Sequence, residues 1–186
     1  MARSAASADA LVARLARARI GATFNQYTRS ELRRERLTAY LESRRDAPLL
    51  LVGEAAGYRG ARVSGLPFTS ERQLTGAGPA EGTATIVHRV LAELGLDEQI
   101  LLWNVVPTHP GTETSNRRPT RAEVADGIGF AHALARGRRV VAVGRLAQEA
   151  LDAPYVRHPS HGGAVGFRDG LLRLRLGGRP VRRFSV

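Results

Sequence analysis

Four side chains that can hold a planar, hydrogen-bonding ring lie at or near the ends of apolar segments of this chain. Glu54 comes directly after the run LLLVG, and Asn104 lies near the end of the segment ILLWNVV. His158 follows the short segment YVR, and Phe68 stands in the glycine-rich stretch between the first two apolar runs. A carboxylate, an amide, an imidazole and an aromatic face supply the hydrogen bonds and the stacking surface that a nucleobase held outside its helix requires. These residues therefore indicate a nucleobase pocket.

Several other kinds of site are excluded or disfavoured. The chain has no lysine and hence no Walker-type nucleotide loop, and it has neither a dinucleotide-binding glycine fingerprint nor a nucleophile elbow. It has no cysteine, which excludes disulfides and cysteine-ligated zinc or iron–sulfur sites. Of the five histidines only His158 and His161 are close in sequence, with no carboxylate cluster beside them. We therefore predict no metal site.

The elements that must position these residues alternate between helix and strand. The spacing of apolar residues predicts helices over 5–19, 29–44, 83–94, 121–136 and 146–151. Short apolar runs predict strands over 49–52, 100–106, 140–143 and 155–157, with loops over 53–82 and 107–120. From residue 164 onward the pattern fits a strand or a helix equally well.

This order predicts an α/β fold, a three-layer α/β/α arrangement around a central, mostly parallel four-stranded sheet. Ligands bind beyond the carboxyl ends of the strands in such sheets, so the loops that carry Glu54, Asn104 and His158 are expected to meet there. We expect a single domain over residues 1–186, with N-terminal helices in 1–45 and the chemistry in a core over 49–162.

Composition limits the partners. Of the 186 residues 43% are apolar, which is enough for one compact domain with a sizeable core. The net charge is +11 and every basic residue is arginine, whose planar guanidinium binds phosphate in a fork, so a nucleic acid is a favoured partner. No stretch approaches the roughly 18 apolar residues of a membrane span, so no membrane partner is expected.

Three segments resemble, in the same order, the signature motifs of the uracil-DNA glycosylase superfamily. GEAAGYRGARVSGLPFTSE at 53–71 is similar to the G-E-A-P-G…G-x-P-F motif of the family-4, iron–sulfur type. NVVPTHPGTETSNRRPT at 104–120 resembles the strand that ends in asparagine and the N-R-x-P turn after it, and HPS at 158–160 resembles the H-P-S/A motif. The chain departs from that type in lacking its four cysteines and in placing Ala56 where the first motif has proline. The resemblance therefore implies a relative without the cluster.

The resemblance implies an enzyme of base excision repair that removes uracil from DNA by hydrolysing its N-glycosidic bond, without a metal or other cofactor. That bond breaks largely before water attacks, so the site must stabilise both a cationic sugar and a uracil anion. Free uracil would be the product. A monomer is expected, in the cytoplasm of a bacterial-type cell and on the nucleoid during repair.

The resemblance also implies catalytic roles. His158 would donate a hydrogen bond to uracil O2, as a neutral imidazole. Asn104 would read the base by accepting from N3–H and donating to O4, a pattern that prefers uracil to cytosine. Glu54 stays open between two roles, because it either orients water or stabilises the sugar cation, or it is a structural carboxylate.

Further residues of the first motif would shape the uracil pocket. Phe68 would stack on the base, with a plain core phenylalanine as the alternative. Gly53, Ala55 and Gly57 would let the base approach the backbone, and Tyr58 would crowd the C5 position and exclude thymine.

Residues of the motif loops would contact DNA phosphates. The arginines are Arg59, Arg62, Arg117, Arg118 and Arg157, and the hydroxyls are those of Ser64, Thr69 and Ser160. The segment HGGAVGF at 161–167 would enter the minor groove, with Val165 or Phe167 as the wedge that fills the gap left by the flipped base.

Other functions remain open at this point, because a shared fold does not secure a reaction. One is a catalytically weak or inactive protein that binds uracil-containing or single-stranded DNA. Another is a glycosylase for a different deaminated or mismatched base. A third, a metal hydrolase that uses the histidines, would lose activity with a chelator.

Overall fold

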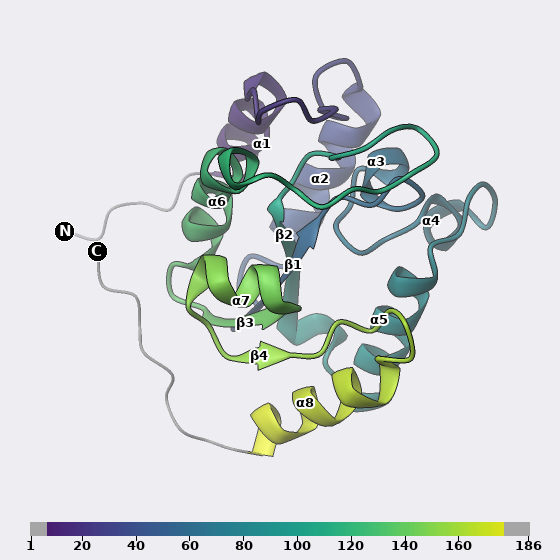
Figure 1. Ribbon diagram of the computed structural model, residues 1–186, viewed down its shortest axis with the longest axis vertical. Helices are drawn as coiled ribbons and strands as arrows, with labels where there is room; N and C mark the ends of the chain where they lie inside the picture. The colour runs from purple at the N-terminus through teal and green to yellow at the C-terminus, as the bar shows by residue number, and fades with distance from the viewer. Residues whose placement is uncertain (1–6, 177–186) are drawn as a thin grey trace.

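One parallel sheet of four strands organises residues 7–176, which the computed structural model describes. The strands are β1 (Leu49–Ala55), β2 (Ile100–Val106), β3 (Arg139–Val143) and β4 (Tyr155–Val156), in the spatial order β2-β1-β3-β4. Helices lie on both sides of this sheet (Figure 1), which confirms the predicted three-layer α/β/α fold.

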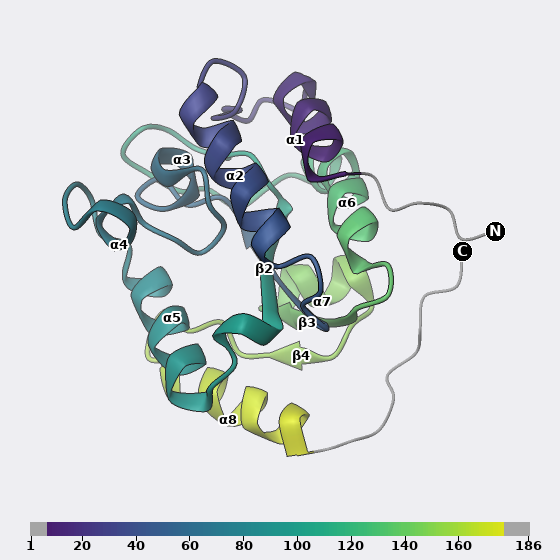
Figure 2. The same ribbon diagram turned by 180° about the vertical axis from the view of Figure 1, so that it is seen from behind.

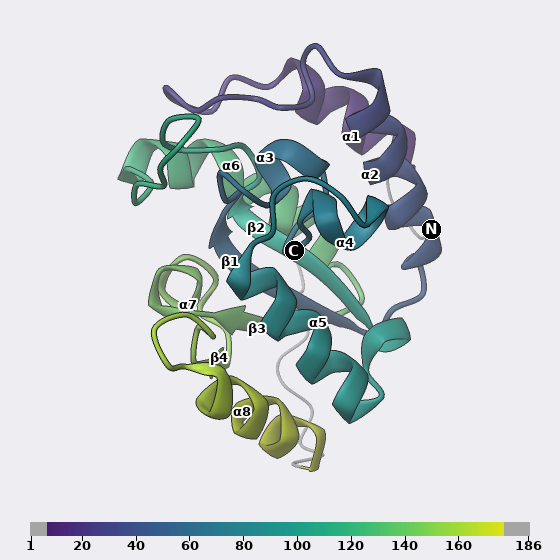
Figure 3. The same ribbon diagram turned by 90° about the vertical axis from the view of Figure 1, so that its right-hand side faces the viewer.

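The helices account for most of the remaining chain. They are α1 (Ala8–Arg17), α2 (Glu31–Ser43), α3 (Ala61–Ser64), α4 (Glu71–Thr75), α5 (Gly82–Leu94), α6 (Arg121–Ala135), α7 (Arg145–Leu151) and α8 (Ala164–Leu176), with a 3-10 turn at Asp97–Gln99. Helix α5 lies beside α8 (Figure 2), and α1 and α2 lie at the opposite end of the molecule from α8 (Figure 3). No helix within residues 7–176 is long and apolar enough to cross a membrane.

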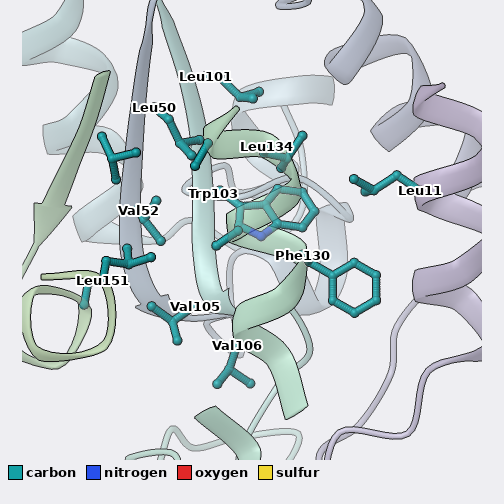
Figure 4. Close-up of a cluster of buried hydrophobic side chains, with 14 of the residues drawn as sticks. Leu11, Leu50, Val52, Leu101, Trp103, Val105, Val106, Phe130, Leu134 and Leu151 are labelled. Atoms are coloured by element: carbon teal, nitrogen blue, oxygen red, sulfur yellow. The ribbon is translucent and has the colours of Figure 1, made fainter. Parts of the chain in front are cut away.

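Successive side chains of each strand point to opposite faces of the sheet. Helices cover both faces, so the side chains on both are buried. Leu50 and Val52 of β1 pack with residues of α1, α2, α6 and α7, whereas Leu51 packs with residues of α5 and α8. Trp103 of β2 is fully buried on the first face, and Figure 4 shows its indole near Phe130 and Leu134 of α6. The sheet is therefore a rigid base for the loops that leave its carboxyl edge.

Local signals set several helix ends. The predicted capping box of α6 is present, since the Thr120 hydroxyl accepts from the Glu123 N–H at 3.2 Å and the Glu123 carboxylate accepts from the Thr120 N–H at 2.9 Å. Helix α5 ends at Gly95, whose positive φ of 63° lets the chain turn away.

The structure corrects three expectations. Strand β1 continues to Ala55, and the segment predicted as a loop over 53–82 contains α3 and α4. The ambiguous segment after residue 164 is helical, because Phe167 and Leu171, four residues apart, form one buried stripe against the sheet. Residues 5 and 6 of the predicted first helix, and residues 177–186, lie outside the described residues.

Candidate active site

A cavity of about 590 Å³ lies at the carboxyl ends of the four strands. It is lined by residues from the end of β1, from β2 and from the segments that follow β3 and β4. Nine of the predicted site residues line it: Glu54, Ala55, Gly57, Phe68, Asn104, Arg117, Arg118, His158 and Ser160. The parallel register brings them together, since segments far apart in sequence end at one edge of the sheet.

Gly53 makes room for the aromatic wall of the cavity. It pairs with Asn104 across β1 and β2, and a Cβ atom at position 53 would overlap Cζ of Phe68 and lie 3.1 Å from Oδ1 of Asn104. Gly53 does not itself line the cavity. The sequence prediction that this glycine admits a base is therefore corrected, because the glycine admits the Phe68 ring beside the Asn104 amide.

The Asn104 amide is free to bind a ligand. Asn104 is only 4% exposed, and its side chain makes no hydrogen bond to any other described residue. The amide atoms are not among the buried polar atoms of residues 7–176 that lack a partner, so solvent reaches them through the cavity and a ligand can take the place of that water. An amide both donates and accepts, which suits a ring edge with one N–H and one carbonyl.

Phe68 is presented by a strained turn. Its φ of 51° is a left-handed conformation that a bulky residue rarely adopts, and its side chain is buried against the sheet and the cavity. The fully buried Ser64 holds this turn, because its hydroxyl accepts from the Leu66 N–H at 3.0 Å and donates to the Thr69 carbonyl at 2.6 Å. Thr69 is buried too and donates its hydroxyl to the Pro67 carbonyl at 3.0 Å. Ser64 and Thr69, predicted to contact phosphate, are thus internal supports of the Phe68 turn.

His158 lines the cavity, and its contacts with Ser160 fix the tautomer of its ring. The Ser160 N–H donates to Nδ1 of His158 at 3.3 Å, and the Ser160 hydroxyl lies 2.8 Å from the same nitrogen. Because a backbone N–H can only donate, Nδ1 is an acceptor and the single proton of the neutral ring is on Nε2. Burial lowers the pKa of His158, and His161 lowers it further. Ser160, predicted as a phosphate contact, therefore orients the imidazole.

Two carboxylates line the cavity, of which the sequence indicated only one. Burial raises the pKa of Glu54, and the nearby Arg118 opposes that rise. Glu81 precedes α5, and its carboxylate fills the space where Cβ atoms at Gly57 and Gly60 would be. Burial raises its pKa as well, and it has no ion-pair partner within residues 7–176. Gly57 therefore makes room for a carboxylate, whereas the sequence predicted that it makes room for the base.

Glu81→Gln is expected to stabilise the protein at neutral pH. A carboxyl whose folded-state pKa is raised contributes stability only at low pH and loses that contribution as the pH rises through the folded-state pKa. Glutamine keeps the shape without acquiring a charge. Urea unfolding at neutral pH should therefore give a larger free energy of unfolding for Glu81→Gln than for the wild type, and the difference should shrink in acid. Glu149→Gln, at an exposed position of α7, is the control. It should change neither the free energy of unfolding at neutral pH nor its dependence on pH. Equal stability of Glu81→Gln and wild type at neutral pH would contradict an uncompensated, half-buried carboxylate.

The arginines predicted to contact DNA differ in whether they already form ion pairs within the protein. Arg117 forms two contacts with the buried Glu123, at 2.5 and 2.8 Å, and lowers the pKa of that carboxyl to about 2. Arg62 pairs with Glu113 at 2.7 Å and lies over the Phe24 ring. Three others, Arg59, Arg118 and Arg157, are exposed and form no ion pair with the described residues.

Two aromatic predictions are corrected. Tyr58, expected at the C5 position of the base, does not line the cavity, and its ring lies beneath the Arg59 guanidinium with 5.2 Å between that group and the ring centre. Phe167 is fully buried in the core, so it cannot be an exposed wedge in this conformation. Val165, the other candidate, is 69% exposed in the first turn of α8.

The described residues contain no group of three or more histidine, aspartate or glutamate side chains that could hold a metal ion. His161, the histidine closest in sequence to His158, contacts the Ser160 hydroxyl at 3.0 Å through Nδ1.

Comparisons with known proteins give one match to a family model and one likeness in fold. Residues 41–176 match the family model of the uracil DNA glycosylase superfamily, a span that includes Glu54, Asn104 and His158. No curated protein sequence matches the chain. Among solved structures, the crystal structure of wild-type SMUG2 from Pedobacter heparinus is similar, with a TM-score of 0.68 over 91% of this chain and 97% of that chain, at 13% sequence identity. At that identity the likeness shows the fold alone.

Proposed function

Because the chain belongs to the uracil DNA glycosylase superfamily, we propose that it removes uracil from DNA by hydrolysing the N-glycosidic bond. The observation that carries this proposal is the unpartnered Asn104 amide, which lies beside the Phe68 ring at the wall of the cavity. A uracil flipped into the cavity would stack on Phe68 and satisfy the amide through its N3–H and O4. Cytosine presents the opposite donor and acceptor pattern at these two atoms.

His158 would stabilise the departing base. As the bond between C1′ and N1 breaks, its electron pair moves into the uracil ring and negative charge gathers on O2. The Nε2–H of His158, fixed by the contacts of Ser160, would donate a hydrogen bond to that oxygen. A water oxygen then bonds C1′ and releases a proton, the uracil anion takes up a proton, and the products are free uracil and DNA that lacks the base.

Glu54 would act on the sugar side of the reaction. Its carboxylate lines the cavity near Arg118, which favours the ionised form. An ionised carboxylate at this place would stabilise the cationic sugar or orient the water. Arg118 would then serve both Glu54 and a DNA phosphate, with Arg59 and Arg157 as further phosphate contacts and Val165 as the wedge.

A gel assay tests the proposal. The purified chain is incubated, with a chelator present, with a labelled oligonucleotide that carries one uracil, and the product is then heated in alkali. Cleavage at the uracil supports the proposal. No cleavage together with a shifted band on a native gel would instead support a protein that binds DNA without excising uracil.

Asn104→Asp is expected to change the choice between bases. An aspartate only accepts, so it would lose the donor to uracil O4 and gain an acceptor for the cytosine amino group. Hydrogen bonds to charged groups contribute about 1.5–3 kcal/mol, so the ratio of uracil to cytosine excision should fall roughly 10- to 100-fold. Single-turnover rates on matched oligonucleotides measure this ratio.

The control is Asn116→Asp, which keeps the oxygen that accepts from the Tyr58 N–H at 2.9 Å. The ratio of uracil to cytosine excision by Asn116→Asp should equal that of the wild type. An unchanged ratio in Asn104→Asp would show that this amide does not read the base.

One observation favours a second substrate. Tyr58, the residue expected to exclude thymine, lies outside the cavity lining. A mismatched thymine is therefore a second candidate, which an oligonucleotide with a G·T pair tests in the same assay.

A further inference from the structure

His109 joins the two loops that form one side of the cavity. Its side chain is fully buried, with Nδ1 2.7 Å from the carbonyl oxygen of Ala56 and Nε2 2.7 Å from that of Thr112. Its backbone is fixed as well, because His109 and Phe24 exchange two N–H to carbonyl hydrogen bonds, each 2.9 Å long. Ala56 lines the cavity and belongs to the loop that follows β1, while Thr112 belongs to the loop that follows β2.

The two contacts require two protons on the ring. A carbonyl oxygen only accepts, so each ring nitrogen must donate. A neutral imidazole has a single N–H, and its other nitrogen would point a lone pair at a carbonyl lone pair across 2.7 Å. No water can relieve this contact, because the side chain has no exposed surface. An imidazolium satisfies both carbonyls with charge-assisted hydrogen bonds.

We propose that His109 is a doubly protonated positioning residue that clamps the Ala56 loop to the Thr112 loop and so sets the shape of the cavity. Its effect on excision rests on the proposed function, whereas its protonation state does not. A buried cation beside Ala56 would also favour the uracil anion that forms in the cavity.

Two further hydrogen bonds join the segment after β1 to the end of β2 and to the loop that follows it. The Ala56 N–H donates to the Val106 carbonyl at 3.2 Å, and the Tyr58 N–H donates to Oδ1 of Asn116 at 2.9 Å. The His109 clamp differs from these two hydrogen bonds. It joins a carbonyl of each loop through one ionisable side chain that is fully buried.

No charged side chain near His109 takes the place of a carbonyl as a hydrogen-bond partner of its imidazole within residues 7–176. The charged side chains carried by the two loops or packed on them are Glu54, Arg59, Arg62, Glu81, Glu113, Arg117 and Arg118. No side chain of this set hydrogen-bonds to the imidazole, so the two carbonyls are its polar contacts within residues 7–176.

Nitrogen-15 NMR of the histidine-labelled wild-type protein tests the protonation state directly. At neutral pH, His109 should show both ring nitrogens protonated, with N–H signals protected from exchange. His158 should show one protonated nitrogen, Nε2. The His109 signals are assigned by their loss in His109→Gln. A single protonated nitrogen at His109 would overturn the proposal, and this measurement does not require excision activity.

Single-turnover excision tests the positioning role. Glutamine cannot donate to two carbonyls on opposite sides, so the loops should shift, and a displacement of about 1 Å in a site can cost about 100-fold in rate. The rate of His109→Gln should therefore fall about 100-fold, whereas its affinity for the uracil-containing oligonucleotide, measured by native-gel titration, should change only a few-fold. His132→Gln, on the exposed side of α6, is the control. A folded His109→Gln with the wild-type rate would overturn the role. If the wild type excises no uracil, the proposed function fails and the NMR result still decides the protonation state.

Discussion

His158→Ala should slow uracil excision by about 100- to 1,000-fold, the usual cost of removing one donor that stabilises a developing oxyanion. The reason is the fixed geometry of the ring. The Ser160 N–H occupies Nδ1 and leaves the Nε2 proton for the base. Binding of uracil-containing DNA should change only a few-fold, because the charge on O2 develops only as the bond breaks. Single-turnover rates and a native-gel titration measure the two quantities separately.

The pH dependence of the same reaction gives an independent check. Neutral His158 accepts the Ser160 N–H at Nδ1, so protonation of that nitrogen would break the contact. Burial and His161 both lower the pKa of His158, which keeps the ring neutral to a lower pH than an ordinary histidine with its pKa of about 6.5. The rate should therefore hold through that range and fall only in more acidic solution.

His161→Ala is the matched variant. It removes the neighbouring charge, so the pKa of His158 should rise and the acid limb should move to higher pH, with the rate at neutral pH nearly unchanged. If His158→Ala retained the wild-type rate, His158 would not be the donor to the base.

The strands were predictable from the sequence because short apolar runs followed by glycine or polar residues specify buried parallel strands, although β1 continues past Gly53 to Ala55. This placed Glu54, Asn104 and His158 at one edge of the sheet, and the structure brings all three to one cavity. The family motifs contributed Phe68, which apolar spacing alone does not distinguish from a core residue.

Other site features depend on contacts that no local pattern encodes. Glu81 lies in a segment that reads only as a polar loop, and its place is known only once Gly57 and Gly60 are seen to enclose its carboxylate. Ser64 looks like a surface hydroxyl in sequence, yet it is fully buried as the support of the Phe68 turn. Such roles arise from how two loops meet, which composition and periodicity do not report.

Gly53→Ala should damage the site more than its size suggests. The added methyl would overlap Cζ of Phe68 and crowd Oδ1 of Asn104, so the stacking surface and the reading amide would both move. A displacement of about 1 Å can cost about 100-fold in rate, and forcing a methyl into packed surroundings costs about 1–3 kcal/mol of stability. Single-turnover excision and urea unfolding measure these losses. Gly129→Ala, on α6 with no atom near its added methyl, is the control and should keep the wild-type rate with equal or slightly higher stability.

A second substitution separates packing from stacking. In the double variant Gly53→Ala/Phe68→Leu, the smaller side chain leaves space for the methyl, so part of the lost stability should return. Excision should stay low, because leucine offers no aromatic face to the base. Recovery of the rate together with the stability would show that the Phe68 ring only fills space, and that the base is held by the Asn104 amide without an aromatic partner.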